Sequence, residues 1–376
     1  NRFDDTMQDD FKKIPGSPLA YWISKNILEC FSLQKISSIA TTRVGCQTSD
    51  NNRFLRVWHE ISFGLIGTSY QSRAESKNYK SKWIPYNKGG DYRKWYGNQE
   101  FVINWLNDGE ELFGFAAELY GSPTRTIKNG DYYFRPSVTW SKISSGFPAF
   151  RYQQPGSIFD VAGASVFYKR DSDRNSILCF LNSIVARKML EVISPTLNFE
   201  TSHIAALPIV NTERISSNLD TIANKCIEIS RADWDSYEKS WNFSAFFIVS
   251  DVARRNSLAA SWNNFSVHQR NQLLQLKLLE EENNRLFINA YGLQDELSPE
   301  VPEDQITLTR ADREKDCQRL ISYAIGCMMG RYSLDEPGLI YAHAGNVGFD
   351  PSRYSRVPAD ADGILPITDE HWFEDD

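Results

Sequence analysis

A short stretch between Lys77 and Gly97 has the residue types of a surface that binds polyanions. It holds six cations, one acid and six aromatic residues. Cations at this density neutralise phosphates and release counterions, and aromatic faces between them stack on bases or enter a groove. The alternative is a solvated loop beside a strand whose aromatic residues are core. The candidate phosphate contacts are Lys77, Lys80, Lys82, Lys88, Arg93 and Lys94, and Trp83 is either a stacking residue or a core residue.

A second set of candidates lies in the Gly/Pro loop between Gly121 and Gly130. Arg125 and Lys128 in this loop are expected to be exposed. Arg, Lys, Thr and Asn side chains on such a loop can donate hydrogen bonds to base edges in the major groove of DNA. A plain hairpin connection is the alternative.

A third candidate string is Thr139–Gly146, which reads TWSKISSG. Trp140 is expected in the core, whereas Ser141 and Lys142 are candidates for contacts with backbone phosphates. Arg151, between Pro148 and Pro155, completes the set of DNA-binding candidates.

Several long strings resemble one family of proteins, the adenine-specific DNA methyltransferases of the BREX phage-defence systems, also called phage growth limitation methyltransferases. The resemblance extends over nearly the whole chain and concerns the non-catalytic, carboxy-terminal part of that family. Because the chain begins without Met, we expect it to be a piece of a longer protein. The strings that carry the resemblance are Trp95–Glu110, Thr139–Gly146, Ser194–Phe199, Ile229–Tyr237, Ala290–Leu293 and Gly330–Leu334.

The chemistry of methyl transfer has no matching motif in this chain. An amino-methyltransferase needs an Asn/Asp/Ser-Pro-Pro-aromatic tetrapeptide to hold the flipped adenine. The nearest string, Ser194–Leu197, lacks the second proline and the aromatic residue, and no Phe-x-Gly-x-Gly cofactor loop occurs. Phosphate-loop, nucleophile-elbow and zinc-helix motifs are also absent. We therefore expect no catalytic residue here, and the resemblance implies S-adenosylmethionine bound by the full-length protein outside this segment.

The charge distribution is uneven, although the net charge is −7. The last eighteen residues, Ala359–Asp376, contain seven acids and no Lys or Arg, so the rest of the chain is neutral overall. From Lys35 to Asp160 there are sixteen cations and eleven acids. Such segregation permits a surface that attracts phosphate on a chain that is acidic in total.

Composition and cysteine usage narrow the class of protein. The chain is 41% hydrophobic and 13% aromatic, which is typical of globular domains, and it has no apolar run long enough to cross a membrane. Its six cysteines and five histidines are scattered without the spacing of metal ligands. This predicts reduced cysteines in a cytoplasmic protein, with neither a metal site nor a membrane partner.

The hydrophobic pattern predicts an α+β chain. Expected strands are Phe54–His59, Phe101–Trp105, Tyr132–Phe134, Val138–Trp140, Ser157–Phe159, Ser165–Tyr168 and Gly338–Ala342. Expected helices are Leu19–Phe31, Asp108–Tyr120, Ile177–Ile193 and Arg313–Met329, the last with Asp312 as its N-cap, Gly330 as its stop and Cys317, Leu320, Ile321, Ala324, Ile325 and Met328 on its apolar face.

Two heptad-spaced seams predict two helices, which, placed just after a recognition domain, resemble the antiparallel spacer helices of type I specificity subunits. The first contains Ile215, Leu219, Ile222, Cys226 and Ile229; the second contains Leu276, Leu279, Asn283, Leu286 and Ala290. Two ordinary amphipathic helices on a core are the alternative. The expected order is a connector from an absent methyltransferase domain (1–34), a mixed, β-rich target-recognition domain (35–210), a helical spacer with an aromatic linker (211–292), and a small α-rich carboxy-terminal domain with an acidic tail (293–376).

These observations predict sequence-specific recognition of double-stranded DNA for an adenine-N6 methyltransferase. The implied partners are duplex DNA, the protein's own methyltransferase domain and other phage-defence proteins, and charge alone adds a hypothesis of a phage inhibitor that mimics DNA. A protein-docking assembly platform with little DNA affinity is one alternative. A carbohydrate-binding surface built on the Trp and Tyr residues is another.

Overall fold

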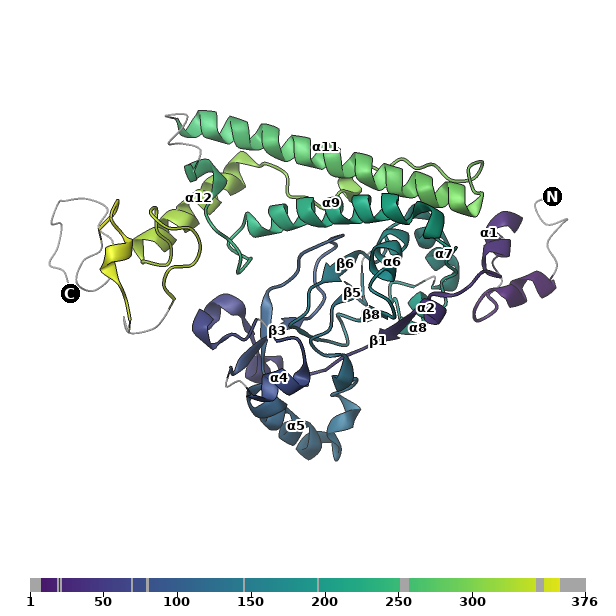
Figure 1. Ribbon diagram of the computed structural model, residues 1–376, viewed down its shortest axis with the longest axis horizontal. Helices are drawn as coiled ribbons and strands as arrows, with labels where there is room; N and C mark the ends of the chain where they lie inside the picture. Colours follow the sequence, from purple (N-terminus) through teal and green to yellow (C-terminus); the bar gives the residue numbers. More distant parts are fainter. Residues whose placement is uncertain are drawn as a thin grey trace. The chain divides into compact units, whose positions relative to one another are not determined.

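A computed structural model describes residues 8–18, 20, 22–68, 70–78, 81–144, 146–194, 196–250, 257–342 and 348–358 (Figure 1). The chain divides into two compact units, each assembled from separate segments. The larger unit comprises Asn1–Arg56, Ile66–Arg231 and Leu273–Leu308; the smaller unit comprises Val57–Leu65, Ala232–Gln272 and Thr309–Asp376. Helices and two small sheets make this an α+β fold, as predicted.

The two sheets have four strands each. The first has the order β1-β8-β5-β6 and is built from β1 (Ala40–Arg43), β8 (Ser165–Tyr168), β5 (Ser137–Trp140) and β6 (Phe150–Gln153), with antiparallel neighbours. The second has the order β2-β4-β3-β7 and is built from β2 (Leu55–Val57), β4 (Phe101–Asn104), β3 (Trp83–Asn87) and β7 (Ile158–Phe159). In it, β3 is antiparallel to β4 and parallel to β7.

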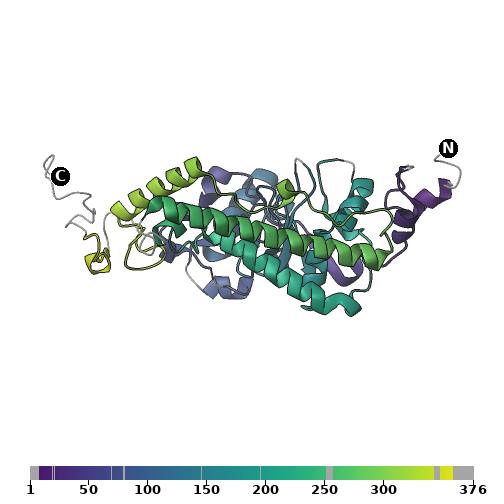
Figure 2. The ribbon, with the colours of Figure 1, turned by 90° about the horizontal axis from the view of Figure 1, so that it is seen from above.

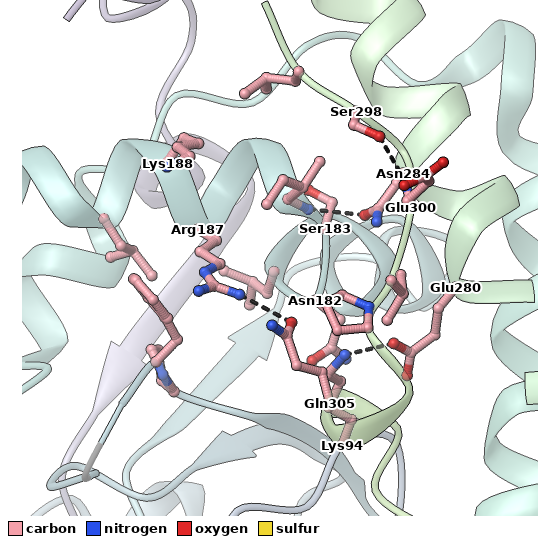
Figure 3. A pocket seen from close by; sticks show the side chains of 18 of the residues that line it. Lys94, Asn182, Ser183, Arg187, Lys188, Glu280, Asn284, Ser298, Glu300 and Gln305 are labelled. Carbon is pink, nitrogen blue, oxygen red and sulfur yellow. Dashed lines mark hydrogen bonds and ion pairs between the residues drawn. The ribbon is translucent and has the colours of Figure 1, made fainter. Parts of the chain in front are cut away.

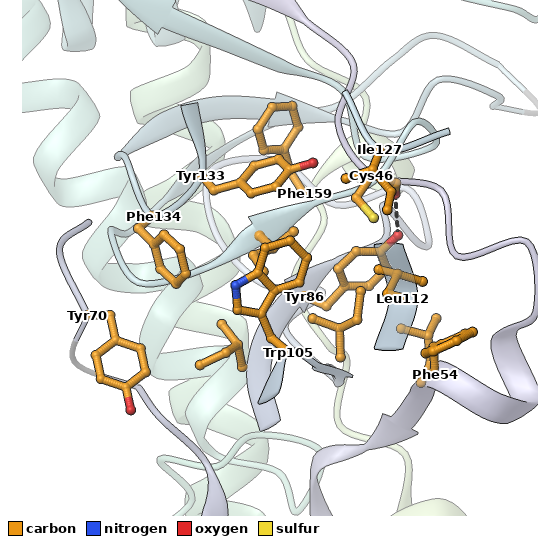
Figure 4. Close-up of a cluster of buried hydrophobic side chains, with 14 of the residues drawn as sticks. Cys46, Phe54, Tyr70, Tyr86, Trp105, Leu112, Ile127, Tyr133, Phe134 and Phe159 are labelled. Atoms are coloured by element: carbon orange, nitrogen blue, oxygen red, sulfur yellow. Dashed lines mark hydrogen bonds between the residues drawn. The ribbon is translucent and has the colours of Figure 1, made fainter. Parts of the chain in front are cut away.

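An aromatic core fixes the second sheet and the loops around it (Figure 4). The Trp105 ring meets Tyr133 edge-on at 5.6 Å, and Tyr133 in turn meets Phe159 at 5.7 Å. Tyr86 donates a hydrogen bond of 2.6 Å to the carbonyl of Cys46, so the polar end of this buried ring is satisfied. Close-packed rings of this kind leave little freedom to the strand ends that follow them.

The helices of the larger unit are mostly short. The predicted helix Ile177–Ile193 is two helices, α6 and α7. The break occurs because Ser183 accepts the N–H of Ala186 as the N-cap of α7, while the side chain of Asn182 bonds the backbone of Phe150. The helices of this unit that precede the spacer are α1 (Lys25–Cys30), α2 (Ile36–Ile39), α3 (Asn51–Phe54), α4 (Arg73–Asn78), α5 (Leu106–Tyr120), α6 (Asp173–Leu181), α7 (Ile184–Ile193) and α8 (Thr201–Ala205).

Two sequence predictions need correction in this unit. Tyr132–Phe134 is no strand, because a 3-10 turn covers Gly130–Tyr132 and Phe134 has a φ of 68°, which a strand does not allow. The helix expected over Leu19–Phe31 is confirmed only as α1, and Leu19 and Tyr21 lie outside the described residues. The 3-10 turns of the described chain are η1 (Gln8–Lys13), η2 (Trp58–Glu60), η3 (Phe63–Leu65), η4 (Pro123–Arg125), η5 (Gly130–Tyr132), η6 (Glu213–Ile215), η7 (Glu303–Gln305) and η9 (Pro351–Arg353).

The predicted spacer helices are α9 (Ser216–Asp235) and α11 (Leu258–Tyr291), which run side by side in opposite directions (Figures 1 and 2). The first seam is confirmed from Leu219 onward, where its members are all buried, whereas Ile215 lies in η6 before the helix and is only half-buried. The second seam is partly wrong: Leu276 and Asn283 are buried, but Ala290 is exposed. Asn283 donates to the carbonyl of Cys179 in α6 at 2.9 Å, so α11 also contacts the larger unit through α6.

The smaller unit is built around α12 (Arg313–Met328) and a cluster of rings from Phe243, Phe265, Tyr323 and Tyr332. Asp312 caps α12 as predicted, accepting the N–H groups of Glu314 and Lys315. Gly330 follows with a φ of 68°, which confirms the predicted stop.

Two other predictions for this unit are wrong. Gly338–Ala342 is no strand, because its backbone makes single bonds to Ser244 and Arg331 and no continuous ladder. The apolar face expected for α12 is also the wrong face: Cys317, Ile321 and Ile325 are exposed, while Tyr323 and Cys327 pack inward. No helix among the described residues is both long and apolar enough to cross a membrane.

Candidate nucleic-acid interface

Two strands of the second sheet, β3 and β7, end at one edge of the larger unit. Because β3 and β7 are parallel and Asn87 pairs with Phe159, the residues that follow them, Lys88 and Asp160, emerge at the same edge. An open pocket of about 510 Å³ lies there, and we call it the strand-end pocket. Its lining includes Gln47, Asn51, Lys88, Ser141, Lys142 and Asn198. Segments that are far apart in the sequence therefore meet around one hollow.

Glycines let the loops of this edge approach one another closely. A Cβ on Gly163 would lie 2.5 Å from the carbonyl oxygen of Asn87, and Gly89 has a φ of +85°. The buried Asn87 side chain donates to Thr139 Oγ1 at 2.6 Å and so ties the end of β3 to β5. Such contacts hold the pocket wall in one geometry.

Each of the two pocket lysines has a carboxylate neighbour. The ammonium of Lys142 lies 2.8 Å from Glu200. Although burial raises the pKa of Glu200, the hydrogen bond and charge of Lys142 lower it overall. Lys88 lies over the Phe101 ring at 5.5 Å; burial lowers its pKa, and the nearby Asp160 acts in the opposite direction.

Asp160 is the acid on the pocket lining. Its Oδ1 accepts the N–H groups of Val161 and Ala162 at 2.5 and 3.3 Å. Burial raises the pKa of this carboxyl, and the two backbone N–H groups, the Tyr86 hydroxyl and Lys88 oppose that effect. A carboxylate held here opposes the binding of an anion in the same hollow.

Arg151 lies behind the pocket and is 1% exposed. Its guanidinium donates to the carbonyl of Arg93 at 3.2 Å and to Ser141 Oγ at 3.4 Å, and no carboxylate of the described residues pairs with it. Burial and the neighbouring charge of Arg93 lower its pKa to about 10, which leaves it protonated at neutral pH. The prediction that Arg151 touches DNA is wrong because the side chain is buried, yet its charge lies next to Ser141.

The Gly121–Gly130 loop adjoins the same pocket. Arg125 and Lys128 are exposed, as expected, and the guanidinium of Arg125 lies over the Tyr120 ring at 5.3 Å. The carbonyl of Thr126 accepts the N–H of Gln47 at 2.9 Å, which attaches this loop to the wall of the strand-end pocket. The two loop cations remain candidates for contacts with DNA.

The basic stretch that suggested nucleic-acid binding does not form one patch. Lys82 precedes β3 and Lys88 follows it, so these two lysines are about 20 Å apart along the strand at roughly 3.3 Å per residue. Lys82 lies over the Trp83 ring at 5.5 Å, and Lys77 pairs with Asp108 at 3.2 Å. Trp83 is 7% exposed, which favours its core role over the stacking role.

Lys94 and Arg93, two further members of this basic stretch, make contacts within the protein. Lys94 is buried, and its ammonium lies 2.5 Å from Glu280 of α11, so the prediction that it contacts phosphate is wrong. Arg93 is half-buried, and its carbonyl accepts from Arg151. Lys80 lies outside the described residues. The sequence candidates that the structure brings together at the pocket are thus Lys88, Ser141 and Lys142.

Sequence reasoning missed several polar residues of this pocket. Gln47 and Asn51 come from the run Gln47–Asn52, whose polar composition indicates a loop but not its neighbours. Asn198 and the exposed Ile143 lie in strings that carried the family resemblance and were not themselves taken as candidates.

A second pocket, of about 350 Å³, lies between α7, α11 and the segment 296–305 (Figure 3). Its charged groups are engaged with one another. Arg187 donates to Gln305 at 2.9 Å and lies over the Phe147 ring at 3.9 Å, while Glu280 holds Lys94. The pocket therefore lies where α11 meets α7, and Lys94 and Glu280 pair within it, whereas the buried Nε of Arg187 has no hydrogen-bond partner among the described residues.

The string closest to a catalytic tetrapeptide is not arranged to hold a flipped base. The side chain of Ser194, which begins the string closest to a catalytic tetrapeptide, is buried and donates to the carbonyl of Asn198 at 3.1 Å. It therefore closes a turn and does not face a cavity where a base could enter. No group of three or more metal-ligating side chains occurs in the described part of the chain.

Comparison with known proteins identifies the chain's relatives as adenine-specific methyltransferases, which confirms the resemblance seen in the sequence. The chain is 39% identical, over 99% of its length, to the adenine-specific methyltransferase PglX of Lacticaseibacillus casei (strain Zhang). It is 36% identical, over 100% of its length, to the adenine-specific methyltransferase BrxX of Escherichia coli O9:H4 (strain HS). The chain spans 31% of the length of each relative. No protein-family model matches it.

Proposed function

We propose that this chain is the segment of a longer adenine-N6 DNA methyltransferase that recognises double-stranded DNA, and that the enzyme marks host DNA in a phage-defence system. The chain would correspond to the carboxy-terminal third of that enzyme, and S-adenosylmethionine and the catalytic residues would belong to the rest. The relatives' names support the activity, and the missing catalytic motifs support the division of labour.

The observation that carries the proposal is the convergence of separate segments on the strand-end pocket. Lys88 and Lys142 supply charge, Gln47, Asn51 and Asn198 supply hydrogen-bonding groups, and glycine-dependent packing holds them in place. Lysines that contact phosphates set affinity, and amide side chains beside them can read base edges. Arg125 and Lys128 extend the same surface along the neighbouring loop.

Duplex binding across a salt series tests the proposal. Each phosphate contact that is lost lowers the slope of log K against log salt by about 0.9. In the full-length protein, Lys88→Gln and Lys142→Gln are each expected to weaken binding and to lower the slope by about one such unit. Lys82→Gln is the matched control, because it removes a lysine from the opposite end of the same strand.

Two results would count against the proposal. In the first, the full-length protein binds duplex DNA, but Lys82→Gln weakens binding as much as Lys88→Gln. In the second, neither pocket lysine changes the slope while the fold remains intact by circular dichroism. Either outcome moves the DNA contacts away from the strand-end pocket.

A role in assembly is a second candidate function, because α12 exposes an apolar stripe. Ile321 is 59% exposed and Ile325 is 48% exposed, and Met329, one turn further on, is 71% exposed. Docking of another defence protein on this stripe would be insensitive to salt, unlike DNA binding. Ile325→Glu would then abolish that association at high salt and leave duplex binding unchanged.

A further inference from the structure

Ile143 is the most exposed large hydrophobic side chain of the described residues, at 75%. It lies three residues beyond the end of β5 and lines the strand-end pocket. An isoleucine side chain that stays exposed at the rim of a polar pocket does not stabilise the fold, because the stabilisation comes from burying apolar surface. Its position calls for a ligand with an apolar surface.

The backbone around Ile143 is held firmly. The N–H of Phe199 donates to the carbonyl of Lys142 at 2.7 Å, and the N–H of Ser144 donates to the carbonyl of Leu197 at 3.1 Å. Ile143 pairs with Asn198 between these two bonds as an isolated antiparallel bridge. Opposite residues of such a bridge point to the same face, so Ile143 and Asn198 are presented together to the pocket, which both of them line.

Leu197 provides an internal comparison. It is 56% exposed and precedes Asn198, but it does not line the pocket. Leu197 lies at a bend just before the bridge residue Asn198, outside the hollow that Ile143 lines. The two apolar side chains share one rigid tip and differ in whether they line the hollow.

The surroundings of Ile143 indicate what its ligand must be. Cationic Lys88 and Lys142 favour an anion, and the amides of Gln47, Asn51 and Asn198 favour a ligand edge with several donors and acceptors. A ligand that is anionic outside, polar at its edges and locally apolar has the chemistry of a DNA groove. Within the major groove, the apolar group on a base is the 5-methyl group of thymine.

We propose that Ile143 is a specificity-determining residue that contacts the 5-methyl group of a thymine in the target duplex. This inference rests on the proposed function, since it specifies what the strand-end pocket reads. The pocket lysines hold the flanking phosphates, and Asn198, on the same face as Ile143, lies next to the base edge.

The experiment uses the full-length protein and a pool of random-sequence duplexes, which first yields the preferred site of the unmodified protein. Ile143→Ala is expected to relax the preference at one thymine position and to keep the others. Duplexes of the preferred site are then made with uracil in place of thymine at that position. Loss of one methyl contact is worth about 0.8 kcal/mol, a factor of about four in affinity.

We expect the uracil duplex to bind the unmodified protein about fourfold more weakly and to bind Ile143→Ala as tightly as the thymine duplex does. Leu197→Ala, the matched control, should retain both the preferred site and the sensitivity to uracil. If Ile143→Ala remains sensitive to uracil at every thymine position, Ile143 does not read the methyl group.

Equal weakening of all duplexes by Ile143→Ala would also overturn the inference, because it would indicate a sequence-independent contact. If Ile143→Ala weakened the binding of an acidic peptide and left the affinity for duplex DNA unchanged, the ligand of Ile143 would be a protein instead. Failure of the unmodified protein to bind any duplex would refute the proposed function itself, and is distinct from these results.

Discussion

Replacing Glu280 with Gln is expected to destabilise the larger unit by about 3–5 kcal/mol, the usual cost of removing one partner of a buried ion pair. The ammonium of Lys94 and the carboxylate of Glu280 lie 2.5 Å apart, with 9% and 4% of their side chains exposed. Burial lowers the pKa of Lys94, but the attraction of Glu280 outweighs it and raises the pKa overall. Without that carboxylate, Lys94 is a buried charge with no counter-ion.

Glutamine is the informative replacement because its side-chain oxygen can still accept the indole N–H of Trp95, now 2.8 Å from Glu280 Oε1. The measured loss then reports the charge of Glu280 and not the indole hydrogen bond. Since the folded-state pKa of Lys94 is raised, its part of the pair contributes fully below the unfolded value of 10.5 and is lost as the pH rises through the folded-state pKa. Neutral pH is thus suitable for the measurement.

The assay is urea denaturation of the full-length protein, followed by circular dichroism. Lys94→Met combined with Glu280→Gln should recover most of the loss, because the buried charge is gone. Glu191→Gln is the matched control: its partner Lys188 lies 2.9 Å away, but both are partly exposed, so the cost should stay below about 1 kcal/mol. A Glu280→Gln variant as stable as this control would refute the assignment of Lys94 to a buried pair.

Two further predictions concern the strand-end pocket. Asp160→Asn should tighten duplex binding, because it removes the acid beside Lys88. Burial raises the pKa of Asp160, so lowering the pH should protonate this carboxyl more readily than an exposed one. Binding by the unmodified protein should then strengthen as the pH falls, and binding by the variant should not. Affinity measured between pH 5 and 8 checks this, and a variant that still responds to pH through this range would contradict it. Gly163→Ala should lower both stability and duplex affinity, because its Cβ would lie 2.5 Å from the carbonyl of Asn87, whereas Gly114→Ala, with nothing within 4 Å, should not reduce either. Thermal unfolding and duplex binding of both variants decide the matter.

The parts of the fold that sequence reasoning predicted are those with a local signal. Asp312 and Gly330 bracket α12 because caps act within one turn. The buried seam of α9 follows from its spacing alone. By contrast, β3 escaped notice because every residue of Trp83–Asn87 is buried, so the alternation that marks a half-buried strand is absent.

The orientation of α12 could not be predicted because both of its faces carry apolar residues. Ile321 and Ile325 are as hydrophobic as the residues that point inward, and the choice depends on ring partners elsewhere in the chain. Tyr323 stacks on Tyr332 at 5.2 Å and meets Phe243 edge-on at 5.8 Å. Aromatic contacts of this kind decide which face is buried, and no periodicity within the helix reports them.

Only part of the candidate site could be predicted from the sequence, because the exposure of its side chains depends on partners elsewhere in the chain. Density of lysines along the chain indicated a cationic surface, but it could not say which ammonium groups reach solvent. The partner of Lys94 is 186 residues away in the sequence. Lys88, Ser141 and Lys142 were found because they lie in unusual strings, whereas Gln47 joins them only through the fold of the loop after β1.

Arg151 adds a buried positive charge behind the strand-end pocket. Lys142 is paired with Glu200, and Asp160 lies close enough to Lys88 to influence its pKa. Arg151 has carbonyl and hydroxyl acceptors but no carboxylate among the described residues. Because it is buried, neither salt nor side-chain motion can screen it as they screen a surface lysine. Under the proposed function, a phosphate placed near Ser141 would be its first counter-ion, while Asp160 on the same lining would act against that phosphate.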